Sequence, residues 1–534
     1  MMSEIATKSL ETSLYSAADA LRSKMDANEY KNYLLGIIFY KYLSDSMLYE
    51  IADEIGDGRE TTTIAEAQEL YEENTADEDL RDELMDTFSY VISPENTFTK
   101  VMEHVNDHSF QIVNLADAFK EVEGTNEIFE GLFDDIDLFS RRLGSNAQKQ
   151  ADTISSVLAA ISELDLVKSS GDSLGDAYEY LIGQFASDSG KKAGEFYTPQ
   201  KVSELLTRLT LVGHNYPDGI TVYDPAMGSG SLLLNFKKYT KQKDEVIYYG
   251  QEINTSTYNL ARMNMILHHV DTANQHLRNG DTLDANWPPS AKTNFDAVVM
   301  NPPYSLHWSS AKGFLEDPRF SKYGVLAPKS KADYAFLLHG FYHLKNSGVM
   351  AIILPHGVLF RGAKEGKIRQ KLLEDGSIDA VIGLPANLFY STSIPTTIVM
   401  LKKNKQDRSV MFIDASKEFE KVKNQNQLRE TDIMKILDTY KKRQDVDKYA
   451  HLASFDEIKE NEFNLNIPRY VDTFEPEPEI DLKQVSKDLT EVNTQIKDSE
   501  KELVGMLTQL TSKDDNVMEG INDIIQDLRG DFNW

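Results

Sequence analysis

The side chains best placed to do chemistry form the run Asn301-Pro302-Pro303-Tyr304. It follows the apolar segment 295–300, which is typical of a buried strand that enters a tight turn. The run would present an amide, a proline carbonyl and an aromatic face together at the end of that strand. Such a set suits a flat, amine-bearing group and favours amine methylation. Because Asn-Pro alone also marks an ordinary turn, residues elsewhere must support the chemical interpretation.

A glycine-rich turn lies upstream, in the segment 222–233, which reads Val-Tyr-Asp-Pro-Ala-Met-Gly-Ser-Gly-Ser-Leu-Leu. This pattern predicts a strand, a turn and a helix. The glycines and serines of its turn are Gly228, Ser229, Gly230 and Ser231. They would let a ligand approach the backbone closely. The spacing matches neither the dinucleotide fingerprint nor the P-loop, and Asp224 at the strand end would repel a phosphate. A cationic or hydroxylated ligand fits this position better.

Two further acidic residues follow the next expected strands. Glu252 closes the second strand, where a carboxylate can accept both ribose hydroxyls of a nucleoside. Asp281 follows a third expected strand and would meet an adenine amine. A nucleoside that carries a cation but no phosphate describes S-adenosylmethionine. Each acid alone would be an ordinary cap or salt-bridge residue, so the evidence is their order at successive strand ends, followed by Asn301.

The elements that must position these residues fall into three predicted domains. Residues 1–165 show helical spacing of apolar residues, as in 30–43, and predict an all-helical domain. Residues 166–473 alternate short apolar strands with helical stretches, which predicts an α/β fold with a parallel, doubly wound sheet. The expected strands include 221–223, 246–250, 297–299, 349–354, 380–384 and 396–401. Residues 474–534 predict a linker, rich in Pro and Glu at 474–479, and a C-terminal helix.

The predicted C-terminal helix carries a heptad pattern. Its apolar residues, spaced alternately by three and four, are Leu482, Val485, Leu489, Val492, Ile496, Leu503, Met506 and Leu510. Only Ser499 interrupts them. About four heptads indicate a coiled-coil-like helix. Such a helix either docks on another chain or packs on its own domain, and its position after a linker favours docking.

Composition restricts the class of protein. A chain of 534 residues has room for about three domains. With no cysteine, it has no disulfide framework, thiolate metal site or cysteine nucleophile. It shows no signal pattern and no apolar run near the ~18 residues of a membrane span, so we expect a soluble cytoplasmic protein without a membrane partner. His268 and His269 lack further ligands at metal spacing, and we expect no metal site.

The net charge of −30 argues against a chain that holds nucleic acid over its whole surface. Residues 51–100 carry fifteen acids against three bases, whereas 361–371 and 402–443 are basic. Each basic run is either a solvated helix face or part of a nucleic-acid surface. If nucleic acid is bound, a partner should supply part of the basic surface. We interpret Glu365-Gly366-Lys367, which is similar to the end of a nuclease motif, as a solvated loop.

The glycine turn and the run 301–304, with the block Gly194-Glu195-Phe196-Tyr197-Thr198-Pro199 ahead of both, resemble the amino-methyltransferases of DNA. The match is closest to the modification subunits of type I restriction-modification systems, and it covers essentially the whole chain. The resemblance implies transfer of a methyl group from S-adenosylmethionine to N6 of adenine in double-stranded DNA. It also implies a separate specificity subunit, usually bound by two copies of this chain, onto which the C-terminal helix docks. Whether a restriction subunit joins stays open.

The resemblance also implies roles for individual residues. Those around the methionine moiety and part of the cofactor pocket would be Glu195, Phe196, Tyr197, Thr198, Pro199 and Gln200. Asp224 would lie near the cofactor ammonium, Glu252 at the ribose and Asp281 at the adenine end. The Asn301 side chain and the Pro302 carbonyl would accept the amine hydrogens of a flipped base. Tyr304 would stack on that base. Phe389 is either a second stacking aromatic or a core residue.

Two other functions stay open. The same grip on a planar amine would serve a methyltransferase for cytosine N4, an RNA base or a protein glutamine. Alternatively, the chain would be a non-catalytic assembly subunit that keeps a methyltransferase fold. The long helical N-terminal region and the C-terminal helix favour the DNA subunit, and the intact motifs speak against an inactive one.

Overall fold

The computed structural model describes residues 16–167, 197–284, 294–390, 392–422, 425–473 and 481–530, with a few single positions and short pieces between 175 and 185. Glu195, Phe196 and the predicted linker 474–479 lie outside the described residues. The chain divides into two compact units, Met1–Thr473 and Phe474–Trp534. In the described ranges, no helix combines the length and apolar character that crossing a membrane would require.

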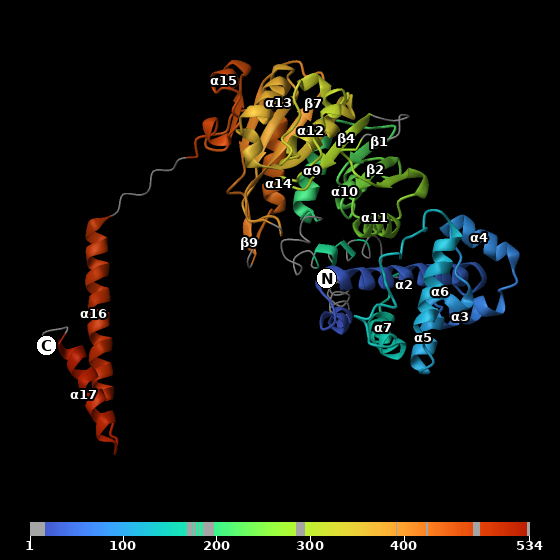
Figure 1. Cartoon of the computed structure of the whole chain (residues 1–534), viewed down its shortest axis with the longest axis horizontal. Helices are drawn as coiled ribbons and strands as arrows, with labels where there is room; N and C mark the ends of the chain where they lie inside the picture. The colour runs from blue at the N-terminus through green and yellow to red at the C-terminus, as the bar shows by residue number, and fades with distance from the viewer. Residues whose placement is uncertain are drawn as a thin grey trace. The chain divides into compact units, whose positions relative to one another are not determined.

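The N-terminal part of the first unit is helical, as predicted (Figure 1). Its described helices are α2 Ala27–Ile55, α3 Ile64–Glu73, α4 Glu78–Phe88, α5 Phe98–Asn106, α6 Ile112–Thr125 and α7 Ala147–Ser162. Side-chain caps define several of their starts: Thr63 forms a capping box with Glu66, and Asp77 accepts two backbone N–H groups of α4. Aromatic rings fill the core, where Phe119 and Phe133 stack with centroids 4.1 Å apart.

A nine-stranded sheet forms the rest of the first unit. Its strands are β1 Ile220–Asp224, β2 Val246–Glu252, β3 Gln275–Asn279, β4 Phe295–Met300, β5 Leu344–Pro355, β6 Ile378–Gly383, β7 Thr396–Lys402, β8 Val410–Asp414 and β11 Ala450–Ala453. The order is β11-β8-β6-β7-β5-β4-β1-β2-β3. Each of the six named expected strands is confirmed. A separate hairpin pairs β9 Glu420–Val422 with β10 Gln425–Gln427.

The sheet is not parallel throughout, and the prediction of a parallel sheet needs correction there. Strand β7 runs antiparallel to both β5 and β6, and β11 runs antiparallel to β8. The described residues between β6 and β7 include no helix, so the chain turns back instead of crossing over to a parallel position. The half that contains β5, β4, β1, β2 and β3 is parallel, and their carboxyl ends meet at one edge.

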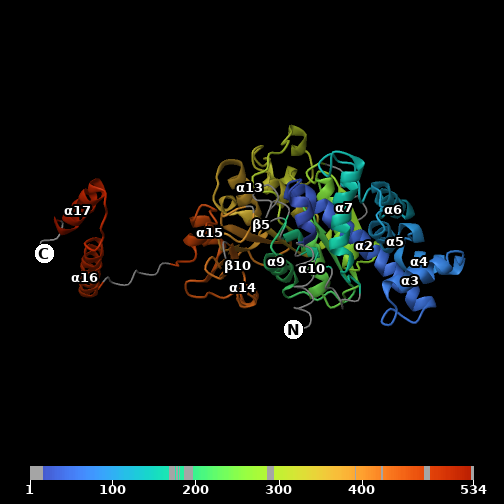
Figure 2. The same ribbon diagram turned by 90° about the horizontal axis from the view of Figure 1, so that it is seen from below.

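Helices cover both faces of the sheet, as Figure 2 shows for α13 on one side and α9, α10 and α14 on the other. One apolar layer includes α9 Gln200–Leu211, α10 Ser231–Tyr239 and α14 Glu430–Lys442. The opposite layer includes α12 Asp333–Tyr342, α13 Ala363–Glu374 and α15 Phe455–Glu460. Helix α11, Thr255–Leu267, also packs against the N-terminal helices, and its Arg262 donates to the Glu130 carbonyl at 3.0 Å.

The second unit contains α16 Leu482–Leu507 and α17 Asp515–Gly530, which lie against each other (Figure 1). The predicted helix is confirmed, but Leu510 lies beyond its end at Leu507. Thr508, Thr511 and Ser512 follow, and such residues bond locally to the backbone and favour turns. The described residues of α16 include no buried side chain, so the second unit by itself leaves the whole apolar stripe at least partly open.

Candidate active site

The carboxyl ends of three parallel strands bring the predicted residues together. Asp224 is the last residue of β1, Glu252 is the last residue of β2, and Asn301 directly follows β4. Since β1 lies between β2 and β4, the three side chains start from adjacent positions at one sheet edge. In parallel α/β sheets, ligands bind outside this edge.

The glycine turn after β1 is shaped by backbone conformations that favour glycine. Gly228 has φ 56° and Gly230 has φ 83°, both in the left-handed region, and Gly230 caps the N-terminus of α10. The Gly228 N–H donates to Glu252 Oε2 at 3.2 Å, so the turn is tied to the end of β2. Asn264 Nδ2 donates to the Ser229 carbonyl at 3.0 Å, and the Ser229 and Ser231 hydroxyls lie 3.1 Å apart. The turn is thus fixed from β2 and α11.

Asp224 is a buried carboxyl group, and only one of its two oxygens has a hydrogen-bond partner among the described residues. The residue is 1% exposed, and its Oδ1 accepts a hydrogen bond from the Ala226 N–H at 2.9 Å. Oδ2 has no hydrogen-bond partner within the part of the chain that the structure describes. Burial, and then the charge of Glu252, raise the pKa of Asp224 to about 8. A cation beside Oδ2 would offset this desolvation, so the position fits an ammonium group.

The other two acids differ from each other in burial. Glu252 is 6% exposed, and its Oε1 accepts the Asn254 N–H at 2.8 Å. Burial raises the pKa of Glu252. Asp281 is exposed, and its Oδ1 accepts the Leu283 N–H at 2.9 Å. Hence Glu252 is held in a fixed orientation at the glycine turn, whereas Asp281 stands at the solvent-facing end of the same edge.

The Asn301 amide is oriented by two hydroxyl groups. Its Nδ2 donates to Thr198 Oγ1 at 3.0 Å, and its Oδ1 accepts from the Tyr304 hydroxyl at 2.7 Å. Thr198, which is buried, comes from the segment before α9. The structure thus joins the two motifs that the sequence places about 100 residues apart, since Asn301 and Thr198 differ by 103 positions. Burial and the Asp333 carboxylate raise the pKa of Tyr304, so its hydroxyl stays protonated and donates.

The aromatic residues near this turn pack at steep angles. The rings of Tyr304 and Phe389 lie edge to face, with centroids 6.3 Å apart and an interplanar angle of 84°. Phe389 is 5% exposed and belongs to the core below the sheet edge. This burial favours the core interpretation of Phe389 over a second stacking face. Tyr304 is half-buried and keeps part of its surface open.

The described residues of the predicted cofactor block lie at the start of α9. Tyr197 is buried and its ring centroid lies 6.0 Å from that of Tyr390. Pro199 is the N-cap residue of α9. Gln200 Nε2 donates to Asn235 Oδ1 at 3.4 Å, while its Oε1 is buried without a hydrogen-bond partner among the described residues. The unpaired oxygen is a second polar atom that a bound ligand could satisfy.

Comparison with known proteins assigns the family. The family model of the N-6 DNA methylases matches residues 169–479. The chain belongs to the N-6 DNA methylase family. A second model, for the HsdM N-terminal domain, matches residues 10–161.

Three relatives of this N-6 DNA methylase are subunits of one kind of enzyme. The MpnII methylase subunit, a type I restriction enzyme subunit of Mycoplasma pneumoniae, is 36% identical, with 98% of this chain and 97% of the relative covered. The MjaVII methylase subunit of Methanocaldococcus jannaschii is 30% identical over 91% of this chain and 82% of its own. A crystal structure of a type I restriction-modification methyltransferase subunit from Streptococcus thermophilus has 59% identity and a TM-score of 0.85, covering 88% of this chain and all (100%) of that chain.

The N-6 DNA methylase fold also gathers residues that the sequence interpretation missed. Glu365, assigned to a solvated loop, is 3% exposed and lies in α13, where Arg361 Nε donates to it at 2.6 Å. Arg369 is buried too and donates to the Val358 carbonyl at 3.0 Å. The interpretation of 365–367 as a solvated loop was therefore wrong. Of the basic residues in 361–371, Arg361 and Arg369 point toward the protein interior. The spacing of Arg361 and Glu365 by four was the available signal.

Proposed function

We propose that the chain has an adenine-N6 methylation site that uses S-adenosylmethionine, in which Asn301 binds the target amine and Asp224 binds the cofactor. The observation that carries the proposal is the Asn301 amide, oriented by Thr198 and Tyr304 at the end of β4, next to the strand that ends in the half-satisfied carboxylate of Asp224. The Asn301 side chain would accept a hydrogen bond from the amine, and the Asp224 carboxylate would bind a cation. The membership in the N-6 DNA methylase family supports this pairing.

The cofactor side is supported by the buried polar atoms. S-Adenosylmethionine, when bound, supplies a methyl group on a sulfonium. Asp224 would hold its ammonium, Glu252 its ribose hydroxyls and Asp281 its adenine amine. The left-handed glycines Gly228 and Gly230 leave the backbone open beside Asp224. The residues present therefore fit this cofactor.

On the substrate side, the residues act on a weak nucleophile. The exocyclic amine of adenine is weak because its lone pair is delocalised into the ring. Asn301 Oδ1 and the Pro302 carbonyl would each accept one amine hydrogen, which directs the lone pair away from them. Tyr304 would stack on the base, worth about 1–3 kcal/mol. The base must leave the duplex to reach this turn. Much of the rate should come from alignment of the reacting atoms.

The whole chain fits a cytoplasmic DNA-modifying complex. We assign residues 1–165 to a helical domain, 166–473 to the methyltransferase domain and 474–534 to docking. The exposed apolar stripe of α16 is suited to a helical partner, which we take to be a specificity subunit that also carries part of the DNA-binding surface. A second copy of this chain would complete the complex. The net charge of −30 fits this division of labour.

Replacing the amide tests the proposal. In the full chain within its complex, Asn301→Ala should lower methylation about 100-fold or more, an effect comparable to the loss of one preorganised hydrogen-bonding group in an active site. Binding of S-adenosylmethionine, measured by calorimetry, should survive. Asn146→Ala, which removes an N-cap from α7 instead, should leave the rate per folded molecule unchanged. An active Asn301→Ala enzyme would contradict the mechanism.

A further inference from the structure

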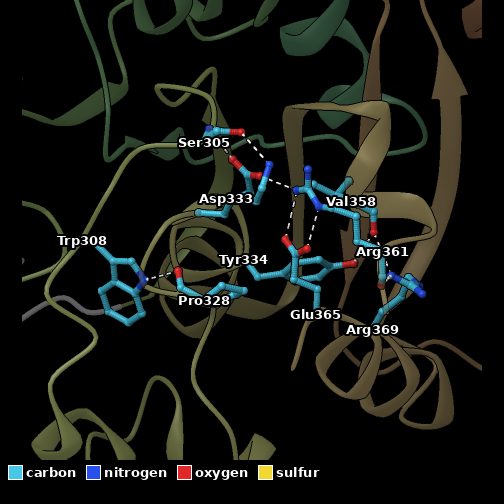
Figure 3. Close-up of polar contacts among 10 residues, drawn as sticks. Ser305, Trp308, Pro328, Asp333, Tyr334, Val358, Arg361, Glu365 and Arg369 are labelled. Carbon is cyan, nitrogen blue, oxygen red and sulfur yellow. Dashed lines mark hydrogen bonds and ion pairs between the residues drawn. The ribbon is translucent and has the colours of Figure 1, made fainter. Parts of the chain in front are cut away.

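The turn that carries Asn301 and Tyr304 ends in a residue of unfavourable backbone conformation. Ser305 has φ 54°, in the left-handed region that side-chain-bearing residues rarely adopt. Its N–H donates to Asp333 Oδ1 at 2.8 Å (Figure 3). Asp333 is 0% exposed and is the first residue of α12. The Asp333 carboxylate, which belongs to α12, thus holds Ser305, the residue that directly follows the run 301–304.

A guanidinium group fixes this carboxylate from the other side. Arg361 Nη2 donates to Asp333 Oδ2 at 2.6 Å. The same guanidinium donates to both oxygens of Glu365, at 2.6 and 3.0 Å (Figure 3). A Cβ atom at Gly357 would come within 2.6 Å of Arg361 Nη1, so the glycine leaves the space that this side chain needs. The carboxylate of Asp333 therefore has little freedom to move.

The direction of these bonds distinguishes Asp333 from an ordinary helix-capping residue. The N-cap of α12 is Ala332, and the Asp333 carboxylate bonds to Ser305 and Arg361, both outside the helix. The cluster pairs two carboxylates with one guanidinium, and Lys331 Nζ donates to the Ser305 hydroxyl at 3.4 Å. After burial, the Asp333 charge is what raises the pKa of Tyr304, whose hydroxyl donates to Asn301. The Asp333 carboxylate therefore acts on the turn in two ways, through its hydrogen bond to the Ser305 N–H and through the electrostatic effect of its charge on Tyr304.

We propose that Asp333 is a positioning residue for the target base. Braced by Arg361, it holds Ser305 in the left-handed conformation and so fixes where the Asn301 amide and the Tyr304 ring face a flipped adenine. The proposal rests on the proposed function of Asn301 and Tyr304. Because a small displacement of an aligned group can cost about 100-fold in rate, loosening this turn should impair base capture and methyl transfer without affecting the cofactor.

The test uses the full chain in its native complex and a duplex with 2-aminopurine at the target adenine. Asp333→Asn keeps the size of the side chain but removes the charge that Arg361 requires. We expect lower fluorescence of the flipped base at saturating protein. Because 2-aminopurine lacks the N6 amine, methylation is measured on a second duplex with adenine at the target, where the rate at saturating DNA should fall at least tenfold, with an unchanged Kd for S-adenosylmethionine. Adding Ser305→Gly to Asp333→Asn should restore part of both signals, because glycine adopts the left-handed conformation without strain.

A matched variant controls for general loss of stability. Asp379 is also buried and paired with cations, Lys402 at 3.0 Å and Arg443 at 2.9 Å, but it lies near the start of β6, away from the carboxyl ends of the strands. Asp379→Asn should lower the Tm while leaving fluorescence and rate per folded molecule unchanged. If Asp333→Asn does not accumulate as folded protein, Arg361→Lys, which loses the forked contact, takes its place with the same expectation.

The outcomes separate this inference from the proposed function. Wild-type fluorescence and rate in Asp333→Asn, or losses that only follow its folded fraction as in Asp379→Asn, would overturn the positioning role. Absence of rescue by Ser305→Gly would overturn it as well. If Asn301→Ala is inactive while Asp333→Asn behaves as wild type, only this inference fails. If Asn301→Ala is active, the proposed function itself fails.

Discussion

At the scale of single residues, Asp224 is a buried acid whose ionisation a bound cation would change. Its pKa of about 8 lies above the ordinary 3.8, because burial disfavours the charged form. Without a cation, the folded protein therefore keeps this proton at neutral pH. The stability that the neutral carboxyl contributes is fully present below about pH 4 and is lost as pH rises from about 4 to about 8.

Cofactor binding should reverse this preference and expel the proton. At about pH 7, calorimetry in buffers of different ionisation enthalpy should show about one proton released for each S-adenosylmethionine bound. Asp224→Asn should bind more weakly and release much less. Binding by the unaltered protein with no proton release would show that Asp224 does not meet the ammonium.

Some of these residues could be predicted from the sequence and others could not. Asp224, Glu252 and Asn301 follow short strands inside recognisable runs, so their meeting at one sheet edge could be inferred from order alone. Asp333 and Glu365 could not be assigned in this way, because their roles depend on contacts with Ser305 and Arg361 that exist only after folding. Glu365 in particular looks solvated until Arg361 is seen turned toward it.

At the scale of elements, apolar runs predicted where strands lie but not the direction of each one. Strand β7 is as apolar as its neighbours and is buried over 396–401, so nothing in its composition distinguishes antiparallel from parallel placement. What decides its direction is the connection from β6, which contains no described helix. The parallel half of the sheet, which carries the site, was predicted correctly.

The packing of β2 under the glycine turn gives a prediction at this scale. A Cβ atom at Gly250 would clash with Met227 Sδ and lie 3.1 Å from Leu233 Cδ1. Gly250→Ala should therefore displace Met227 and the turn, weaken S-adenosylmethionine binding about tenfold and destabilise the fold by about 1–3 kcal/mol.

Gly313→Ala is the matched control, because nothing lies within 4 Å of its added Cβ. Calorimetry and thermal unfolding should find this variant close to the unaltered protein. Equal cofactor affinity in the Gly250→Ala and Gly313→Ala variants would mean that β2 does not support the turn as we describe.

At the scale of the whole molecule, the second unit has an apolar surface on α16 that the unit itself does not bury. The stripe on α16 includes Leu489, 61% exposed, and Ile496, 45% exposed. We define the docking stripe by the exposed residues Leu482, Val485, Leu489, Val492, Ile496, Leu503 and Met506. Exposed apolar stripes of this length mark partner interfaces.

Charges on the docking stripe should separate assembly from cofactor binding. The double change Leu489→Glu and Ile496→Glu should abolish association with the proposed specificity subunit in size-exclusion chromatography, because it would bury unpaired carboxylates. Affinity for S-adenosylmethionine should not change. The control pair Thr490→Glu and Thr494→Glu adds the same charges at exposed polar positions of α16 and should leave the complex intact. Assembly by the stripe variant would contradict the docking assignment.

The identity of the methylated atom tests the central claim most directly. The purified complex is incubated with DNA and methyl-labelled S-adenosylmethionine, and the nucleosides are then separated by mass spectrometry. We predict that the label appears as N6-methyladenine and is lost with Asn301→Ala. Label in N4-methylcytosine, RNA or protein, with no methyladenine, would contradict the account.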